Sequence, residues 1–131
     1  MSTTDTYAVD AWAWIEYLRS STNATLVNMI ENSELITSAV TLSEVISKLE
    51  RNGFDVQKAF EALTSLSKIT DVKVQAAREA GLLHAEIKKK HPNFGLTDAF
   101  VLQLAREMGA KVLTGDPDFE GIKDVELIRK P

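Results

Sequence analysis

The stretch LTDAFVLQLAREMGAKVLTGDPDF, residues 96–119, is the part of this chain from which its fold can be worked out. Apolar residues recur at helical spacing after Thr97, the expected N-cap, and Gly109 is the expected end of that helix. The apolar run at 110–113 then predicts a short, buried parallel strand that ends at Thr114. The stretch therefore predicts a helix, a tight turn and a buried strand in succession.

Two aspartates stand at the ends of these elements. Asp98 lies at the N-terminal end of the apolar stripe of the helix, which is the side that faces the core. Asp116 comes just past the end of the strand. In open α/β sheets, functional sites lie outside the carboxyl ends of the strands. The stretch thus predicts an acidic pocket to which it contributes these two aspartates, with other segments of the chain supplying the rest.

Strands and helices alternate along the rest of the chain. Further strands are expected at residues 7–9, 34–40, 69–72 and 125–128. Further helices are expected at residues 11–18, 24–31, 41–53, 56–68 and 74–90. This alternation predicts an α/β fold with a mostly parallel sheet flanked by helices.

Composition narrows the class of protein. A chain of 131 residues with 44% apolar content fits one domain, residues 1–131, with a hydrophobic core. The absence of cysteine excludes disulfides, thiolate metal sites and cysteine nucleophiles, and the net charge of -4 argues against coating nucleic acid by bulk charge alone. No secretory leader is recognisable, and no apolar run approaches the roughly 18 residues of a membrane span. We therefore expect a soluble, cytoplasmic protein.

Four acids fall where a strand ends or a helix begins: Asp10, Glu44, Asp98 and Asp116. Three of them follow strands and so emerge at the same edge of a parallel sheet. At about 6 Å and an effective dielectric constant near 20, each pair of ionised carboxylates repels by roughly 3 kcal/mol. The repulsion is relieved if some of the carboxylates have raised pKa values and are protonated, or if a divalent cation binds between them. An oxygen-only ligand set selects Mg²⁺ or Mn²⁺, which can activate water for attack on a phosphodiester.

Each acid also has a purely structural interpretation. The order Thr41-Leu-Ser-Glu44 fits a capping box, and Glu44 can pair with Lys48 one turn later. The three aspartates fit helix starts, either as N-caps or as a first-turn acid favoured by the helix dipole: Asp10, Asp98 and Asp116. The joint placement of all four acids is what favours a functional site.

The order of four motifs carries a family resemblance: Asp10 after the first strand, TLSEV with Glu44, GLTDAF with Asp98, and VLTGDPDF with Asp116. Over essentially the whole chain, this order resembles the PIN-domain family and, more narrowly, the VapC-type toxins of toxin–antitoxin pairs. The resemblance implies a five-stranded parallel sheet and a Mg²⁺- or Mn²⁺-dependent endoribonuclease with these four acids in its active site. It also implies a homodimer and a small antitoxin whose C-terminal segment occupies the active-site groove.

Two further positions match the family pattern less specifically. Thr114 matches a small hydroxyl residue two positions before the last acid, and Asp118 matches a position that is acidic or polar in some members. The chain departs from the pattern after Asp10, where Ala11 and Trp12 replace the hydroxyl-containing residues that are common there. Position 11 therefore lacks a hydroxyl that would help to orient the metal shell or the substrate.

Aromatic and basic clusters have two interpretations each. Trp12, Trp14 and Tyr17 stand at helical spacing, which favours a core or dimer-interface role over base stacking. The basic run at 88–91 suits the negative end of a helix dipole, which favours a solvated helix end over phosphate contacts.

We expect a metal-dependent ribonuclease acting on single-stranded or looped RNA, with Asp10, Asp98 and Asp116 on the metal and Glu44 completing its shell. Water attack would leave a 5′-phosphate and a 3′-hydroxyl, as the resemblance implies. One alternative is a catalytically decayed PIN-fold module that binds RNA or a partner peptide. A second is a receiver-type phosphoacceptor domain, which would need a lysine at a late strand end, where residues 114–116 offer an acid.

Overall fold

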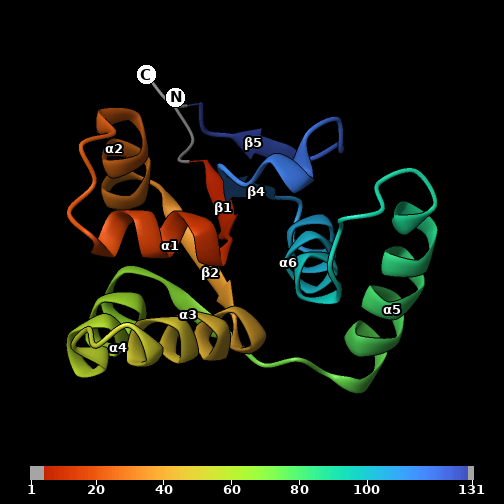
Figure 1. The fold of residues 1–131 in the computed structure, drawn as a ribbon. Coiled ribbons are helices and arrows are strands. Elements are labelled where there is room, and N and C mark those ends of the chain that lie inside the picture. Colours follow the sequence, from red (N-terminus) through yellow and green to blue (C-terminus); the bar gives the residue numbers. More distant parts are fainter. Residues whose placement is uncertain (1–4, 130–131) are drawn as a thin grey trace.

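A five-stranded sheet forms the centre of the protein, whose computed structural model describes residues 5–129 (Figure 1). The strands are β1 (Thr6–Val9), β2 (Glu34–Ser38), β3 (Lys68–Thr70), β4 (Lys111–Thr114) and β5 (Val125–Leu127). Every neighbouring pair is parallel, in the order β3-β2-β1-β4-β5. The predicted parallel α/β sheet is confirmed, and the strand order differs from that of receiver-type domains. The N-terminal residues in which no secretory leader was recognised lie partly outside the described residues.

Helices cover both faces of the sheet. They are α1 (Ala11–Leu18), α2 (Ala24–Asn32), α3 (Ala39–Arg51), α4 (Val56–Leu66), α5 (Val74–Lys88), α6 (Leu96–Glu107) and the 3₁₀ turn η1 (Pro117–Phe119). Figure 1 shows α1 to α4 on one side of the sheet and α5 and α6 on the other. Within residues 5–129, no helix is long and apolar enough to cross a membrane.

The strands divide the apolar core into two layers because successive side chains point to opposite faces. In β1, Tyr7 and Val9 pack with α1 to α4, whereas Ala8 packs with α6. Leu113 and Val112 of β4 divide between the layers in the same way. Burial on both faces is the reason why these strands are short runs of apolar residues rather than alternating ones.

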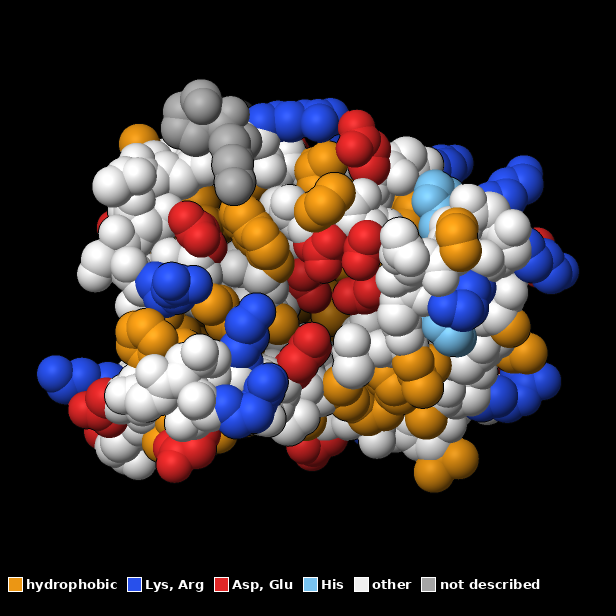
Figure 2. All heavy atoms as spheres, in the orientation of Figure 1, with side chains coloured by type: hydrophobic (Ala, Val, Ile, Leu, Met, Phe, Trp, Pro, Cys, Tyr) orange, Lys and Arg blue, Asp and Glu red, His pale blue; other side chains and the backbone are white. Residues whose placement is uncertain are grey.

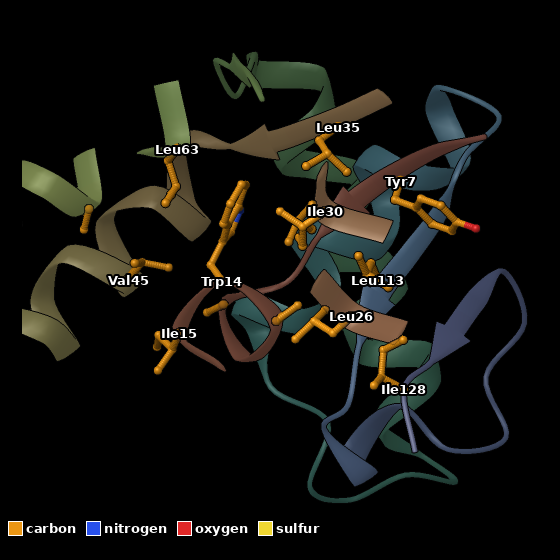
Figure 3. Close-up of a cluster of buried hydrophobic side chains, with 14 of the residues drawn as sticks. Tyr7, Trp14, Ile15, Leu26, Ile30, Leu35, Val45, Leu63, Leu113 and Ile128 are labelled. Atoms are coloured by element: carbon orange, nitrogen blue, oxygen red, sulfur yellow. The ribbon is translucent and has the colours of Figure 1, made fainter. Parts of the chain in front are cut away.

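Trp14 is the largest fully buried side chain. It lies in the core layer between the sheet and helices α1 to α4, beside Val45 and Leu63 (Figure 3). Its indole N–H donates a 3.0 Å hydrogen bond to the Thr37 hydroxyl, so its polar atom is also satisfied. Tyr17 is half-buried and meets the Trp14 ring edge-on. The expected core role is confirmed for Trp14.

The start of α3 differs from the prediction. The strand was expected to run to residue 40 and the helix to begin at Thr41, but β2 ends at Ser38 and α3 begins at Ala39. The Ser38 hydroxyl accepts the Val40 N–H at 3.1 Å and so caps the helix earlier. Thr41 is therefore inside the first turn, and the structural interpretation of Glu44 as part of a capping box with Thr41 is wrong.

The N-cap of α6 also differs from the prediction. Thr97 was expected to cap the helix, but the N-cap is Gly95 and the helix begins at Leu96. The Gly95 N–H donates to the Asp98 carboxylate at 2.7 Å, so the contact that fixes the helix start comes from its third residue. At the other end Gly109 adopts φ 64, the left-handed conformation expected of a helix stop.

The other boundaries shift by one or two residues, as helix ends commonly do. Helix α5 ends at Lys88 and α4 at Leu66, each two residues earlier than expected, and β3 starts and ends earlier than 69–72. Asp55 caps α4 as predicted, because its carboxylate accepts the N–H groups of Gln57 and Lys58.

Candidate active site

A pocket of about 450 Å³ opens at the carboxyl edge of the sheet, between α1 and α3 on one side and α6 on the other. Figure 2 shows carboxylates gathered in a hollow near the centre of this face. All four predicted acids line the pocket: Asp10, Glu44, Asp98 and Asp116. The fold therefore brings together side chains from four separate segments of the chain.

Asp10 is the most deeply buried acid, with 4% of its surface exposed. It follows β1 directly, and its backbone N–H donates to the Leu113 carbonyl at 3.0 Å, which continues the β1–β4 pairing. Asp10 occupies the N-cap position of α1, but its side chain makes no cap hydrogen bond. Burial raises its pKa to about 7, with further contributions from the charges of Asp98 and Glu44.

Thr114, the last residue of β4, links two of the acids from behind the pocket wall. It is fully buried, and its hydroxyl donates a 2.8 Å hydrogen bond to the Asp10 carboxylate. The same hydroxyl oxygen accepts the Asp116 backbone N–H at 3.0 Å. Thr114 therefore fixes the Asp10 side chain relative to the backbone that carries Asp116.

Asp116 combines a structural contact with a place in the pocket. Its carboxylate accepts the Asp118 N–H at 2.9 Å, so it is the N-cap of η1 as the structural interpretation predicted. Asp118 itself does not line the pocket. Its charge nevertheless contributes to raising the pKa of Asp98, so Asp118 lies close to the acidic group.

Asp98 and Glu44 face the pocket from helices on opposite sides. Both are half-buried, and burial is the largest cause of the raised pKa of each. The charge of Asp116 raises both pKa values, while Lys48 counteracts the shift at Glu44. Glu44 and Lys48, which the structural interpretation allowed to pair, form no salt bridge among the described residues.

The donor set suits a hard divalent cation. All four side chains offer carboxylate oxygens. Burial is the largest cause of the raised pKa values of Asp10, Glu44 and Asp98, and the charges of neighbouring acids raise each of these pKa values further. Within residues 5–129, no three histidine or acidic side chains already lie at metal-ligand spacing. A cation bound here would neutralise the carboxylates and draw them together.

Seven residues that sequence reasoning had not assigned to the site also line the pocket: Ala11, Trp12, Ile15, Glu16, Arg19, Lys48 and Arg51. The spacing of Lys48 and Arg51 is a sequence signal for this placement. They follow Glu44 by four and seven residues and so share its face of α3.

The basic run at 88–91 does not line this pocket. Lys88 donates to the Pro92 carbonyl at 2.8 Å, and Lys89 pairs with Glu86, which confirms the expected solvated helix end.

Trp12 forms part of the pocket wall by lying against Gly115, the residue between Thr114 and Asp116. A Cβ atom at position 115 would overlap the six-membered ring of Trp12. Glycine is therefore required here by a neighbouring side chain and not by an unusual backbone conformation. The contact joins the start of α1 to the loop that carries the last acid.

We expect Gly115→Ala to lower the free energy of unfolding by about 1–3 kcal/mol, because the added methyl group overpacks against Trp12. Urea unfolding in a double-mutant cycle with Trp12→Ala checks the cause, since the penalty should largely disappear once the ring is removed. Gly81→Ala, in the middle of α5 with no atom near the added Cβ, is the control and should not destabilise. An equal penalty with and without Trp12 would contradict the contact.

Comparison with known proteins places this geometry in a family. A sequence model of the PIN domain matches residues 7–125. No curated protein sequence matches the chain. Among solved structures, VapC20 of Mycobacterium tuberculosis, a sarcin-ricin loop cleaving toxin, is similar with a TM-score of 0.74 and 18% identity, covering 95% of this chain and 100% of that one.

Two complexes are also similar in structure to this chain, with equal TM-scores. A toxin-antitoxin complex from Klebsiella pneumoniae gives a TM-score of 0.70 at 19% identity, covering 92% of this chain and 95% of that one. VapBC2 from Rickettsia felis, bound to a DNA fragment from their promoter, gives 0.70 at 17% identity, covering 94% and 97%. At these identities the structures establish a shared fold. The sequence match over nearly the whole length shows more, and the chain belongs to the PIN domain family.

Proposed function

We propose that this protein is a divalent-metal-dependent endoribonuclease and the toxin of a type II toxin–antitoxin pair. The observation that carries the proposal is the pocket in which four carboxylates from separate segments face one another. Membership of the PIN domain family supports it, as do structural neighbours described as toxin–antitoxin complexes and as a cleaving toxin. The opposed charges in the pocket give a physical reason for a bound cation.

Asp10, Asp98 and Asp116 would hold a Mg²⁺ or Mn²⁺ ion, with Glu44 completing its shell directly or through water. When bound, such an ion supplies an activated water and neutralises charge on the phosphodiester. The protein orients the ligands through its own hydrogen bonds: Thr114 holds Asp10, and the Gly95 amide holds Asp98.

The proposed partners follow from the same family. We propose an RNA substrate, a cognate antitoxin protein and a homodimeric assembly of single-domain chains in the cytoplasm, with cleavage leaving a 5′-phosphate. The toxin–antitoxin complexes among the structural neighbours support the antitoxin. The groove that an antitoxin segment would occupy is the pocket lined by the four acids.

Cleavage of a mixed RNA pool tests the proposal directly. Purified protein, free of antitoxin, is incubated with the pool and Mg²⁺, Mn²⁺ or EDTA. We expect cleavage with at least one of the two metals and none in EDTA, with activity restored when metal is added back, because the bound ion lowers the pKa of its water and neutralises charge on the phosphodiester.

Two results would count against this function. Cleavage that persists in EDTA would show that the carboxylate pocket is not the source of the activity. Folded protein that cleaves under no metal condition, yet still binds RNA or a peptide, would instead favour the alternative of a catalytically decayed binding module.

A further inference from the structure

The pocket has a cationic wall as well as an acidic one. Arg19, at the end of α1, and Lys48 and Arg51, on α3, line the same hollow as the four carboxylates. Helices α1 and α3 pack against each other, and Lys48 and Arg51 are three residues apart on one helix face. Figure 2 shows Lys and Arg side chains to the left of the central carboxylates, on the α1 and α3 side.

Within residues 5–129, the three cations of this wall form no direct ion pair with a carboxylate. All three side chains belong to exposed residues. Other exposed cations do pair with carboxylates, as Arg78 does with Glu79 at 3.1 Å. Glu44 and Glu16 line the same pocket, so carboxylates are present but do not contact the three cations.

The two arginines of the wall make few contacts within the protein, and these contacts leave N–H donors unused. The Arg51 Nε donates to the Ser47 carbonyl at 3.2 Å, which leaves its terminal nitrogens free within the described residues. The Arg19 guanidinium lies over the Phe54 ring, with its Cζ 6.0 Å from the ring centre, and donates no hydrogen bond within the described residues. Each arginine therefore keeps hydrogen-bond donors for an external anion.

The net negative charge of the protein is unfavourable for binding RNA, which is a polyanion. The net charge is -4, so the protein as a whole repels a polyanion, and the carboxylates of the pocket do so most strongly. Phosphate groups contribute most of the affinity of proteins for nucleic acids, through contacts with Lys and Arg. Cations placed beside the carboxylates are positioned to hold the RNA backbone close to the reacting phosphodiester.

We infer that Arg19, Lys48 and Arg51 form a phosphate-binding wall that holds the backbone of single-stranded RNA beside the four carboxylates. This inference rests on the proposed ribonuclease function and extends it, because it states which side of the pocket the strand occupies. The strand lies along the α1–α3 side, with its scissile phosphate beside the four carboxylates. These residues position the substrate and take no part in the chemical step.

Binding without turnover tests the wall. Labelled single-stranded RNA is titrated in Mg²⁺ with the Asp98→Asn protein, and again after adding Arg19→Gln, Lys48→Gln and Arg51→Gln. We expect affinity at about 0.1 M salt to fall at least about tenfold, and the slope of log affinity against log salt to fall by about two units, since each lost phosphate contact accounts for about 0.7.

The matched control removes three positive charges elsewhere that also form no salt bridge within residues 5–129, with Lys68→Gln, Lys73→Gln and Lys111→Gln in the same background. These residues are exposed and do not line the pocket, so affinity and salt slope should change little. A charge-preserving variant, Arg19→Lys with Lys48→Arg and Arg51→Lys, should keep most of the affinity. Equal losses from the pocket and control triples would overturn the inference.

Two further readouts separate this inference from the function on which it rests. In protein that retains Asp98, the pocket triple should raise KM far more than it lowers kcat, because the wall binds ground state and transition state alike. If no variant cleaves RNA but the pocket triple alone loses RNA binding, the nuclease proposal fails and the wall stands. If an acidic peptide of matched length binds the wall more tightly than RNA does, the assignment to RNA is overturned.

Discussion

Asp98→Asn is expected to reduce RNA cleavage at least about 100-fold while leaving the fold intact. The substitution removes one of the negative charges proposed to hold the metal, and loss of such a group costs two or more orders of magnitude in activity. Asparagine retains an oxygen that can accept the Gly95 N–H, the 2.7 Å contact that fixes the start of α6. The measurement is cleavage of the RNA pool in Mg²⁺ or Mn²⁺, alongside circular dichroism.

The same variant should be slightly more stable than the wild type without metal. Burial and the charge of Asp116 raise the pKa of Asp98, so its ionised form destabilises the folded protein at neutral pH. Thermal unfolding in EDTA should therefore give a higher Tm for Asp98→Asn. Asp71→Asn, which removes an exposed charge after β3, is the matched control for both measurements. Full activity of Asp98→Asn would remove Asp98 from the site.

The metal-free protein is expected to lose stability as pH rises from about 4 to about 7, on the order of 4 kcal/mol from Asp10. Its pKa is raised to about 7 in the folded state, mainly by burial. In the unfolded chain the pKa is near 3.9. Between these values the folded protein binds a proton that the unfolded chain does not, so stability falls with rising pH. Above pH 7 both states are ionised and the loss is complete.

Asp10→Asn should remove most of this dependence. The variant cannot ionise, yet its side-chain oxygen can still accept the 2.8 Å hydrogen bond from Thr114. Urea unfolding in EDTA at pH 5 and pH 8 should show a smaller difference for Asp10→Asn than for the wild type, and a clear gain in stability at pH 8. Adding Mg²⁺ at pH 8 should stabilise the wild type more than the variant, because a cation offsets the buried charge. Identical pH dependence in the two proteins would contradict the role of Asp10.

Local sequence signals determined most of the fold. Gly109 ended a helix and Asp55 capped one because each acts on neighbouring residues within a single turn. The errors occurred where two capping groups competed, as Ser38 and Thr41 did at the start of α3. Sequence spacing alone does not decide which hydroxyl reaches a free backbone N–H.

The sequence also determined which acids share the candidate site. Asp10 and Asp116 follow neighbouring parallel strands, and strands of one direction deliver their carboxyl ends to one edge. Only the tertiary structure decided how they are held. The hydrogen bond from Thr114 to Asp10 joins residues 104 positions apart, and the contact of Trp12 with Gly115 spans a similar separation.

The cationic wall shows most clearly what the sequence determines and what only the tertiary structure decides. From sequence, the structural interpretation of Glu44 allowed Lys48 to pair with it, because four residues separate them on one helix. In the folded protein Lys48 makes no salt bridge among the described residues and faces a shared pocket with Arg19 and Arg51. Sequence fixes which charges exist and on which element they lie. Whether a charge is neutralised depends on distances to every other charge in space, and these distances exist only once the helices have packed.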